Sequence, residues 1–178
     1  ISFEPGKDAY SELIKNSKKD NQWRVFEKIA LGNKSGSKKL NISKNSVSSS
    51  FRVINEIHLV HELNAKYIKN ELSKIIKLDG IFKKFYKKDK NIMLKIDTQG
   101  FEWEVLQGSK KSLKNIKIIQ LELSFIELYS KQYNWLKTLN FLEKNNFKVF
   151  KIIDGFKNKK SGQVMQSDFF LINTKFIR

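Results

Sequence analysis

The sequence predicts an α/β domain whose sheet is mostly parallel, with an antiparallel hairpin at its C-terminal edge. Strand-like apolar segments alternate along the chain with segments whose apolar residues recur every three or four positions, which is typical of alternating strands and helices. The last two strand-like segments are separated only by a Gly- and Lys-rich loop, which favours a hairpin. A length of 178 residues suits a single domain over residues 1–178.

The first half of the chain predicts short elements on either side of a polar insertion. Turn residues, capping residues and apolar spacing set their limits. The expected elements are, in order, a strand end at residues 1–4, a turn at Pro5-Gly6, a helix capped by Asp8, strands at 23–31 and 37–42, a serine-rich loop at 43–50, partial helix within 53–70 and a strand at 71–77.

The second half predicts longer and more regular elements. The lysine-rich segment after Asp79 carries aromatic residues at helical spacing, and we interpret it as an amphipathic helix with a solvated basic face. The expected elements are a helix capped by Asp79, a strand at 92–96, a helix at 102–106 ended by Gly108, a strand at 117–124, a helix capped by Asn134, and strands at 147–153 and 167–174.

The segment from Leu94 to Gly108 carries the clearest chemical signal. An apolar run ends in the acid Asp97, Gly100 follows three residues later, and a helix-forming stretch begins after it. A buried strand that delivers a carboxylate to its C-terminal end, before a turn and a helix, builds sites in open α/β sheets. The pattern therefore predicts an enzyme with Asp97 at its centre.

Composition excludes several classes of function. The formal charge is +17, but the only arginines are Arg24, Arg52 and Arg178. Because arginine is the preferred residue for planar phosphate and base recognition, we expect no specific nucleic-acid partner. The chain has no cysteine, which excludes disulfides and thiol chemistry. It also shows neither a signal peptide nor an apolar run long enough for a membrane span, so we expect a cytoplasmic protein; its oligomeric state is not predicted.

Short motifs in a fixed order connect the chain to a known family. They are Phe3-Glu4-Pro5, Ala30-Leu31-Gly32, Ser48-Ser49-Ser50, Leu78-Asp79, the segment from Leu94 to Gly108, and Gln166-Ser-Asp168-Phe169. Together they resemble the FkbM-type methyltransferases over essentially the whole chain. The resemblance implies a Rossmann-like class I methyltransferase sheet and S-adenosylmethionine as cofactor. It also implies transfer of a methyl group to a hydroxyl of a small-molecule or glycan acceptor, such as a sugar or a natural-product scaffold.

One part of the family pattern is missing. No glycine-rich strand and turn precedes Phe3-Glu4-Pro5, although the family places that strand between the strand ending at Glu4 and the strand ending at Asp97. Unpaired backbone groups inside a sheet are costly. We therefore expect this chain to be a fragment that lacks the first strand and is insufficient for activity by itself. Without that strand, the sheet should have a gap, or its two neighbours should pair directly.

The resemblance assigns roles to individual residues. Glu4 is expected to accept hydrogen bonds from the cofactor's ribose, and Ala30 and Leu31 to lie near its adenine. Asp97 is the expected catalytic residue and also faces the cofactor; it would hold the acceptor hydroxyl, take its proton, or face the sulfonium charge. The residues expected to line the acceptor side are Ser48, Ser49, Gln99, Glu102 and Glu122.

Two other functions compete with this hypothesis. A carboxylate at Glu4 also suits a nicotinamide-dependent oxidoreductase, because such enzymes bind ribose in the same way. The lysine content suits a non-enzymatic module that binds nucleic acid or an anionic glycan. A metal site is not expected, since His58 and His61 have no third ligand at convincing spacing.

Overall fold

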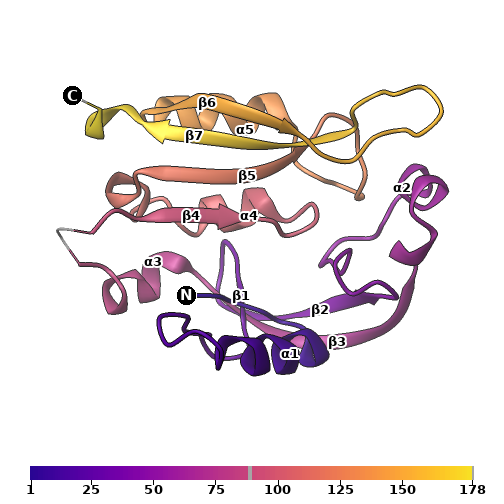
Figure 1. Ribbon diagram of the computed structural model, residues 1–178, viewed down its shortest axis with the longest axis horizontal. Coiled ribbons are helices and arrows are strands. Elements are labelled where there is room, and N and C mark those ends of the chain that lie inside the picture. Colours follow the sequence, from indigo (N-terminus) through magenta and orange to yellow (C-terminus); the bar gives the residue numbers. More distant parts are fainter. Residues whose placement is uncertain (88–89, 178) are drawn as a thin grey trace.

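The computed structural model describes residues 1–87 and 90–177, and it contains a four-stranded and a three-stranded β-sheet (Figure 1). The strands are β1 (Ala30–Leu31), β2 (Gly36–Ser43), β3 (Tyr67–Ile76), β4 (Met93–Ile96), β5 (Ile118–Ser124), β6 (Phe147–Asp154) and β7 (Gln166–Asn173). The α-helices are α1 (Lys7–Ser17), α2 (Glu56–His61), α3 (Leu78–Ile81), α4 (Glu102–Gln107) and α5 (Trp135–Lys144). Short 3-10 turns lie at Leu63–Ala65, Phe82–Lys84, Leu113–Asn115 and Thr174–Phe176.

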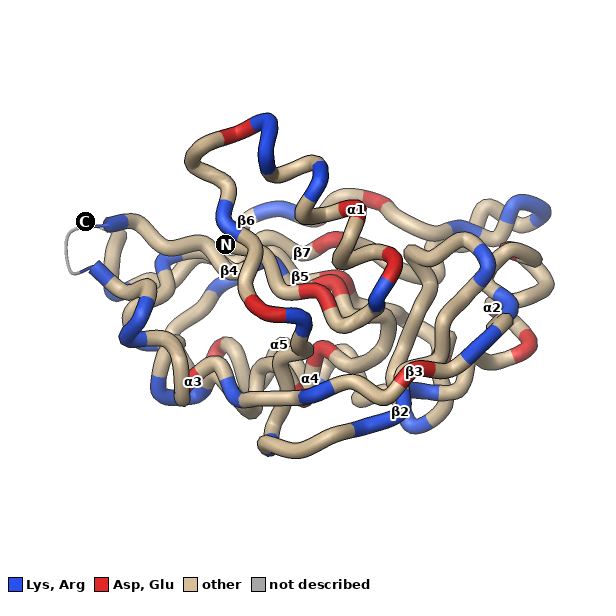
Figure 2. Tube along the Cα trace, turned by 90° about the horizontal axis from the view of Figure 1, so that it is seen from below, with Lys and Arg blue, Asp and Glu red and all other residues tan. Residues whose placement is uncertain are grey.

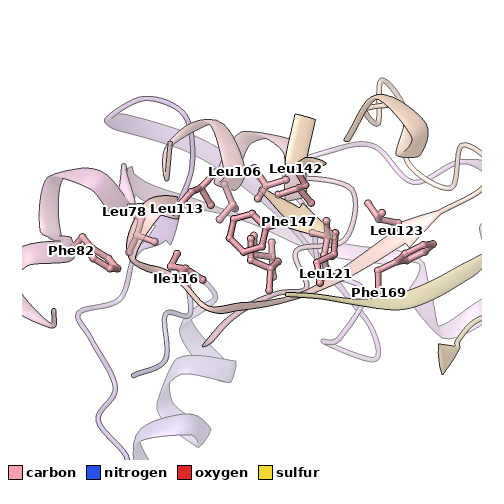
Figure 3. Close-up of a cluster of buried hydrophobic side chains, with 14 residues drawn as sticks. Leu78, Phe82, Leu106, Leu113, Ile116, Leu121, Leu123, Leu142, Phe147 and Phe169 are labelled. Atoms are coloured by element: carbon pink, nitrogen blue, oxygen red, sulfur yellow. The ribbon is translucent and has the colours of Figure 1, made fainter. Parts of the chain in front are cut away.

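The four-stranded sheet has the order β4-β5-β7-β6. β4 and β5 are parallel, and β7 is antiparallel to both β5 and β6. Alternate residues of β5 and β7, including Leu121 and Phe169, enter the main hydrophobic core, where they meet Leu106 of α4 and Leu142 of α5 (Figure 3). Burying this apolar face against the two helices is the main stabilising contribution here.

The three-stranded sheet has the order β1-β3-β2 and a smaller core. β1 is parallel to β3, whereas β2 and β3 form a long antiparallel ribbon. Phe101, which immediately precedes α4, packs with Phe51 at a ring-centroid distance of 5.1 Å in the core of this sheet. The start of α4 is therefore held between the two sheets.

The prediction of a mostly parallel sheet is wrong. The strands form two mixed sheets, in which the parallel pairs are β1/β3 and β4/β5 and the other pairs are antiparallel. The antiparallel β2/β3 ribbon explains much of the difference, because half of the residues in its two strands are exposed and such a ribbon needs only one covered face. The mixed α/β class and the antiparallel C-terminal hairpin of β6 and β7 are confirmed.

The gap expected in the sheet is present. Among the described residues, β4 pairs with β5 only, and the two sheets are separate. The segment before α1 does not pair with β4; Ser2 instead forms a single parallel bridge with Val25. The segment that carries Glu4 and the strand that precedes Asp97 are thus not side by side in one ladder.

Several local predictions also need correction. No strand forms at residues 1–4, and within residues 23–31 only the Val25 bridge and the short β1 have strand pairing. Asp8 does not cap α1, since its carboxylate pairs with Lys69 while Glu71 accepts the Lys7 N–H at 2.8 Å. A carboxylate from β3 therefore satisfies a free N–H at the helix start, a long-range contact that local capping rules do not reveal.

Asp79 is likewise not a helix cap. It lies inside the single-turn α3, and its carboxylate accepts hydrogen bonds from the backbone N–H groups of Lys111 and Ser112 at 3.0 and 2.9 Å. This contact holds the turn that follows α4. The cap predicted at Asn134 is confirmed, because its side chain accepts from Lys137 N at 3.1 Å.

Candidate functional site

A cavity of about 600 Å³ occupies the space between the two sheets. Its walls come from the segment before α1, from β1, from the loop after β2 and from the end of β4. Glu4, Ala30, Leu31 and Asp97, the residues predicted to bind a cofactor, all line it. The fold therefore brings together residues from three segments that are distant in sequence, and the volume is within the range of small-molecule sites.

Asp97 follows the last residue of β4 and lines this cavity. Its Oδ2 lies 3.0 Å from the Lys95 ammonium, and its Oδ1 accepts a hydrogen bond of 2.9 Å from the Gln99 amide. Burial opposes the charged form, but the Lys95 and Gln99 contacts outweigh it and hold the pKa of Asp97 below its ordinary value. Asp97 is therefore a charged hydrogen-bond acceptor at neutral pH and a weak base.

The loop after Asp97 is shaped by Glu102, the first residue of α4. Glu102 is buried, and its Oε1 accepts from Thr98 N at 2.9 Å, Thr98 Oγ1 at 3.1 Å and Gly100 N at 3.0 Å. Burial raises the pKa of this carboxyl, against the opposing effect of these donors. Glu102 does not line the cavity, so its contacts describe a residue that folds the loop; contact with an acceptor stays a prediction.

Gln99 connects Asp97 to the neighbouring strand. Its Nε2 also donates to Glu122 Oε2 on β5 at 2.8 Å, and its Oε1 accepts from the Tyr129 hydroxyl at 2.7 Å. Gln99 lines the cavity, whereas Glu122 lies behind it. Burial and the negative charge of Asp97 raise the pKa of Glu122 to about 9, so that this carboxyl is neutral at pH 7.

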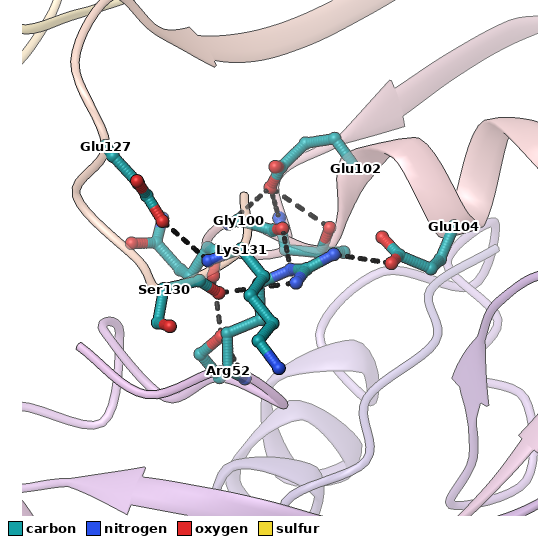
Figure 4. Close-up of polar contacts among 10 residues, drawn as sticks. Arg52, Gly100, Glu102, Glu104, Glu127, Ser130 and Lys131 are labelled. Carbon is teal, nitrogen blue, oxygen red and sulfur yellow. Dashed lines mark hydrogen bonds and ion pairs between the residues drawn. The ribbon is translucent and has the colours of Figure 1, made fainter. Parts of the chain in front are cut away.

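Arg52 clamps this loop to the rest of the molecule (Figure 4). Its Nε donates to Gly100 O at 2.6 Å and its Nη1 to Ser130 O at 3.3 Å. Its Nη2 lies 2.5 Å from Glu104 Oε1, and both side chains are largely buried. The planar guanidinium can reach three partners in fixed directions, which suits it to joining three segments.

Glu4, which also lines the cavity, is held by its own turn. Its Oε1 accepts from Gly6 N at 2.7 Å. Burial raises the pKa of Glu4, with the Gly6 hydrogen bond acting in the other direction. Its second oxygen is not used in that contact. Ala30 and Leu31 add apolar surface to the lining, so the cavity offers both a carboxyl group and apolar walls.

The two serines predicted to line the acceptor side are placed differently. Ser49 lines the cavity, while Ser48 is buried in its own loop, where its Oγ accepts from Asn45 Nδ2 at 3.0 Å. His58 is buried in contact with Tyr129 and Phe156, at ring-centroid distances of 5.2 and 5.0 Å. Within residues 1–87 and 90–177, no group of His, Asp and Glu is arranged to hold a metal ion.

Sequence reasoning missed three residues that organise the site. Lys95 forms an ion pair with Asp97, and Tyr129 donates a hydrogen bond to Gln99. Arg52 holds the loop that follows Asp97 through Gly100 O. For Arg52 a signal was available, because arginine is rare in a chain whose cations are nearly all lysine. Tyr129 lies in the segment after β5, where no local pattern marks it.

Comparison with protein families decides between the competing hypotheses. The model of the Methyltransferase FkbM domain matches residues 1–149. The chain belongs to the FkbM methyltransferase family. The matched region contains every residue predicted for the site, and it ends within β6, before the Asp168 motif. Comparisons with curated proteins and with solved structures give no match.

Membership of this family supports a methyltransferase in general terms. No helix in the part of the chain that the structure describes is long and apolar enough to cross a membrane. The identity of the acceptor and the place of the protein in the cell stay predictions.

Proposed function

We propose that this domain uses S-adenosylmethionine, bound in the cavity between the two sheets, to methylate a hydroxyl oxygen of a sugar, a glycan or a natural-product scaffold. The observation that carries the proposal is the convergence of Glu4, Ala30, Leu31 and Asp97 on that one cavity in a chain of the FkbM methyltransferase family. These residues come from three separate parts of the sequence.

The residues present fit the cofactor. Glu4 offers a carboxylate to ribose hydroxyls, and Ala30 and Leu31 provide apolar walls of the same cavity for a base. The charged carboxylate of Asp97 also lines this cavity, which suits a ligand that carries a sulfonium. When bound, S-adenosylmethionine supplies an electrophilic methyl group.

The low pKa of Asp97 disfavours one of its three predicted roles, that of general base. A carboxylate held in its charged form by Lys95 is a poor general base but a strong hydrogen-bond acceptor. Asp97 would therefore orient the acceptor hydroxyl toward the methyl carbon and interact with positive charge. Alignment of reacting atoms is itself a large source of rate acceleration in a displacement of this kind.

The distribution of charge argues against a non-enzymatic polymer-binding module. Lys and Arg are spread along the whole trace, and Asp and Glu lie among them (Figure 2). Glu122 and Asp168 face each other across β5 and β7. The carboxyl groups of Glu4 and Asp97 line the cavity itself, which suits a cationic cofactor better than a polyanion.

Calorimetry on the full-length protein tests the proposal. S-adenosylmethionine should bind, a nicotinamide dinucleotide should not, and Glu4→Gln should weaken binding about tenfold because a charged hydrogen-bond acceptor is lost. Glu12→Gln, at an exposed position of α1, is the matched control and should bind normally. Asp97→Asn should abolish methyl transfer to a hydroxyl acceptor. Tight binding of the dinucleotide without binding of S-adenosylmethionine would refute the proposal.

A further inference from the structure

The backbone of Gln99 is held in an unfavourable conformation. Its φ is +54°, in the left-handed region that residues other than glycine rarely adopt. Such a conformation is strained and persists only where neighbouring contacts fix it. Here the Ser50 hydroxyl donates to Gln99 O at 2.6 Å, and the next residue, Gly100, also has a positive φ of 88°. The consequence is that the Gln99 side chain reaches both Asp97 and Glu122.

Every polar group of the Gln99 side chain is used. Its two amide hydrogens are directed to Asp97 Oδ1 at 2.9 Å and Glu122 Oε2 at 2.8 Å. Its oxygen accepts from the Tyr129 hydroxyl at 2.7 Å. Because a charged carboxylate can only accept hydrogen bonds, the donor from Tyr129 and the acceptor on Asp97 together fix which way the amide faces.

Tyr129 is itself tightly packed. It is fully buried, and its ring packs against Gly100 so closely that a Cβ added there would lie 2.7 Å from the Tyr129 Cβ. The neighbouring Ser130 is held by a 2.8 Å hydrogen bond from its N–H to Val53 O. Burial raises the pKa of the Tyr129 hydroxyl, so it remains a donor throughout the neutral range.

We propose that Tyr129 and Gln99 are positioning residues, in which Tyr129 fixes the Gln99 amide and the amide holds the Asp97 and Glu122 carboxyls as a pair at the end of β4 and β5. The inference rests on the proposed function for its catalytic consequence. The Tyr129 hydroxyl donates to Gln99 and the two carboxyls accept from the Gln99 amide, so this hydroxyl acts on the pair through Gln99.

The pair has a defined charge. Glu122 is neutral at pH 7 because it is buried and faces other acids, whereas Asp97 keeps its charge through Lys95 and Gln99. The titratable groups that surround Glu122 are Asp97 after β4, Glu102 on α4, Asp168 on β7, Lys95 on β4 and Tyr129. Loss of the amide donor should raise the pKa of Asp97, since a hydrogen bond to the charged form lowers it.

The hydrogen bonds that run from Tyr129 through Gln99 to the two carboxyls form a relay. A double-mutant cycle on the full-length protein tests this relay. Tyr129→Phe keeps the ring and removes the hydroxyl, and Gln99→Met removes the amide. Each should lower kcat about tenfold, with little change in the KM for S-adenosylmethionine, and move the acidic limb of the pH profile upward by roughly half a unit to one unit. The two changes together should cost no more than Gln99→Met alone. Tyr133→Phe, whose ring stacks on Trp103, is the control and should leave the profile unchanged.

A readout without turnover separates this inference from the proposed function. In protein with ¹³C-labelled carboxyls, the Asp97 signal should titrate at higher pH in Tyr129→Phe and Gln99→Met than in the parent, with melting temperatures confirming that each variant is folded. Independent, additive effects of the two substitutions, or an unchanged Asp97 titration, would overturn the relay. A shifted titration in a protein that binds no S-adenosylmethionine would overturn the proposed function and leave the relay standing.

Discussion

Gly108 lies directly against the backbone of Gly32: a Cβ added to Gly108 would be 1.9 Å from the Gly32 carbonyl oxygen. Gly108 ends α4 and Gly32 follows β1, so this contact joins the helix beneath the four-stranded sheet to the three-stranded sheet. The φ of Gly108 is −78°, which any residue can adopt. Space, rather than backbone freedom, is what requires glycine at this position.

Gly108→Ala should therefore destabilise the protein strongly. A backbone carbonyl cannot move aside as a flexible side chain can, so the expected loss is about 3 kcal/mol, at the upper end of overpacking costs. Gly80→Ala is the matched control, because a Cβ at Gly80 in α3 meets nothing within 4 Å. Urea denaturation of both variants measures the difference. A loss below about 1 kcal/mol for Gly108→Ala would show that the two sheets can separate at this point.

Gly100→Ala tests the contact between the loop after Asp97 and Tyr129. Gly100 has a φ of +88°, and a Cβ there would lie 2.7 Å from the Cβ of Tyr129. Gly162 also has a positive φ, of +75°, but nothing lies within 4 Å of its added Cβ. Gly162→Ala should lower the free energy of unfolding by about 1 kcal/mol, the cost of a positive φ in alanine. Gly100→Ala should lower it by at least twice as much and displace the loop. Equal losses in the two variants would mean that Tyr129 does not constrain Gly100.

The sequence could predict the elements whose signals are local. The strand that ends at Asp97, the helix from Glu102 to Gly108, the Asn134 cap and the C-terminal hairpin each depend on residues close together in the chain, and each is present. Apolar spacing and capping residues encode such elements directly. The predictions that failed concern contacts made across the fold.

Asp8 and Asp79 illustrate that failure. Both are good capping residues by type and position, yet Asp8 pairs with Lys69 and Asp79 holds the turn at Ser112. An acid at a helix start satisfies whichever donors the tertiary structure places near it, and those donors are 61 and 33 residues away. The prediction of a mostly parallel sheet failed for a related reason, because the direction of a strand depends on which neighbouring strand it pairs with.

For the site, the sequence identified residues by position but not the contacts that hold them. Glu4, Ala30, Leu31, Ser49, Asp97 and Gln99 all reach one cavity. The bridge from Gln99 to Glu122 and the donor from Tyr129 were not foreseen, since they require the left-handed backbone of Gln99. That conformation is a result of the surrounding fold, and glutamine itself does not favour it.

Replacing Arg52 should show how much its three contacts contribute to the stability of the protein. Arg52→Met leaves the Glu104 carboxylate largely buried without its partner, and one Glu104 oxygen already lacks a hydrogen bond among the described residues. The expected loss is about 3 kcal/mol, because an uncompensated buried charge is costly. Adding Glu104→Gln should recover part of it. Arg24→Met, at an exposed position, is the control, and urea denaturation is the measurement. If the double variant recovers no stability, the loss comes instead from the hydrogen bonds that Arg52 donates to Gly100 O and Ser130 O.

The raised pKa of Glu122 predicts how stability depends on pH. This carboxyl ionises near pH 4.5 in an unfolded chain and near pH 9 in the folded protein. Between these values the folded state binds more protons than the unfolded state, so the contribution of Glu122 is fully present below about pH 4.5 and is lost as the pH rises toward 9.

Glu122→Gln should remove that dependence, since glutamine keeps an acceptor oxygen and never ionises. At about pH 8 the variant should be more stable than the parent by about 2 kcal/mol, which is less than the whole shift implies because the side chain is partly accessible to water. Near pH 4.5 the two proteins should have similar stability. Glu12→Gln on the exposed face of α1 is the control and should follow the parent at every pH. Parallel stability curves for Glu122→Gln and the parent would show that Glu122 is ionised in the folded protein, and Asp97 would then not be the only charged carboxylate held by Gln99.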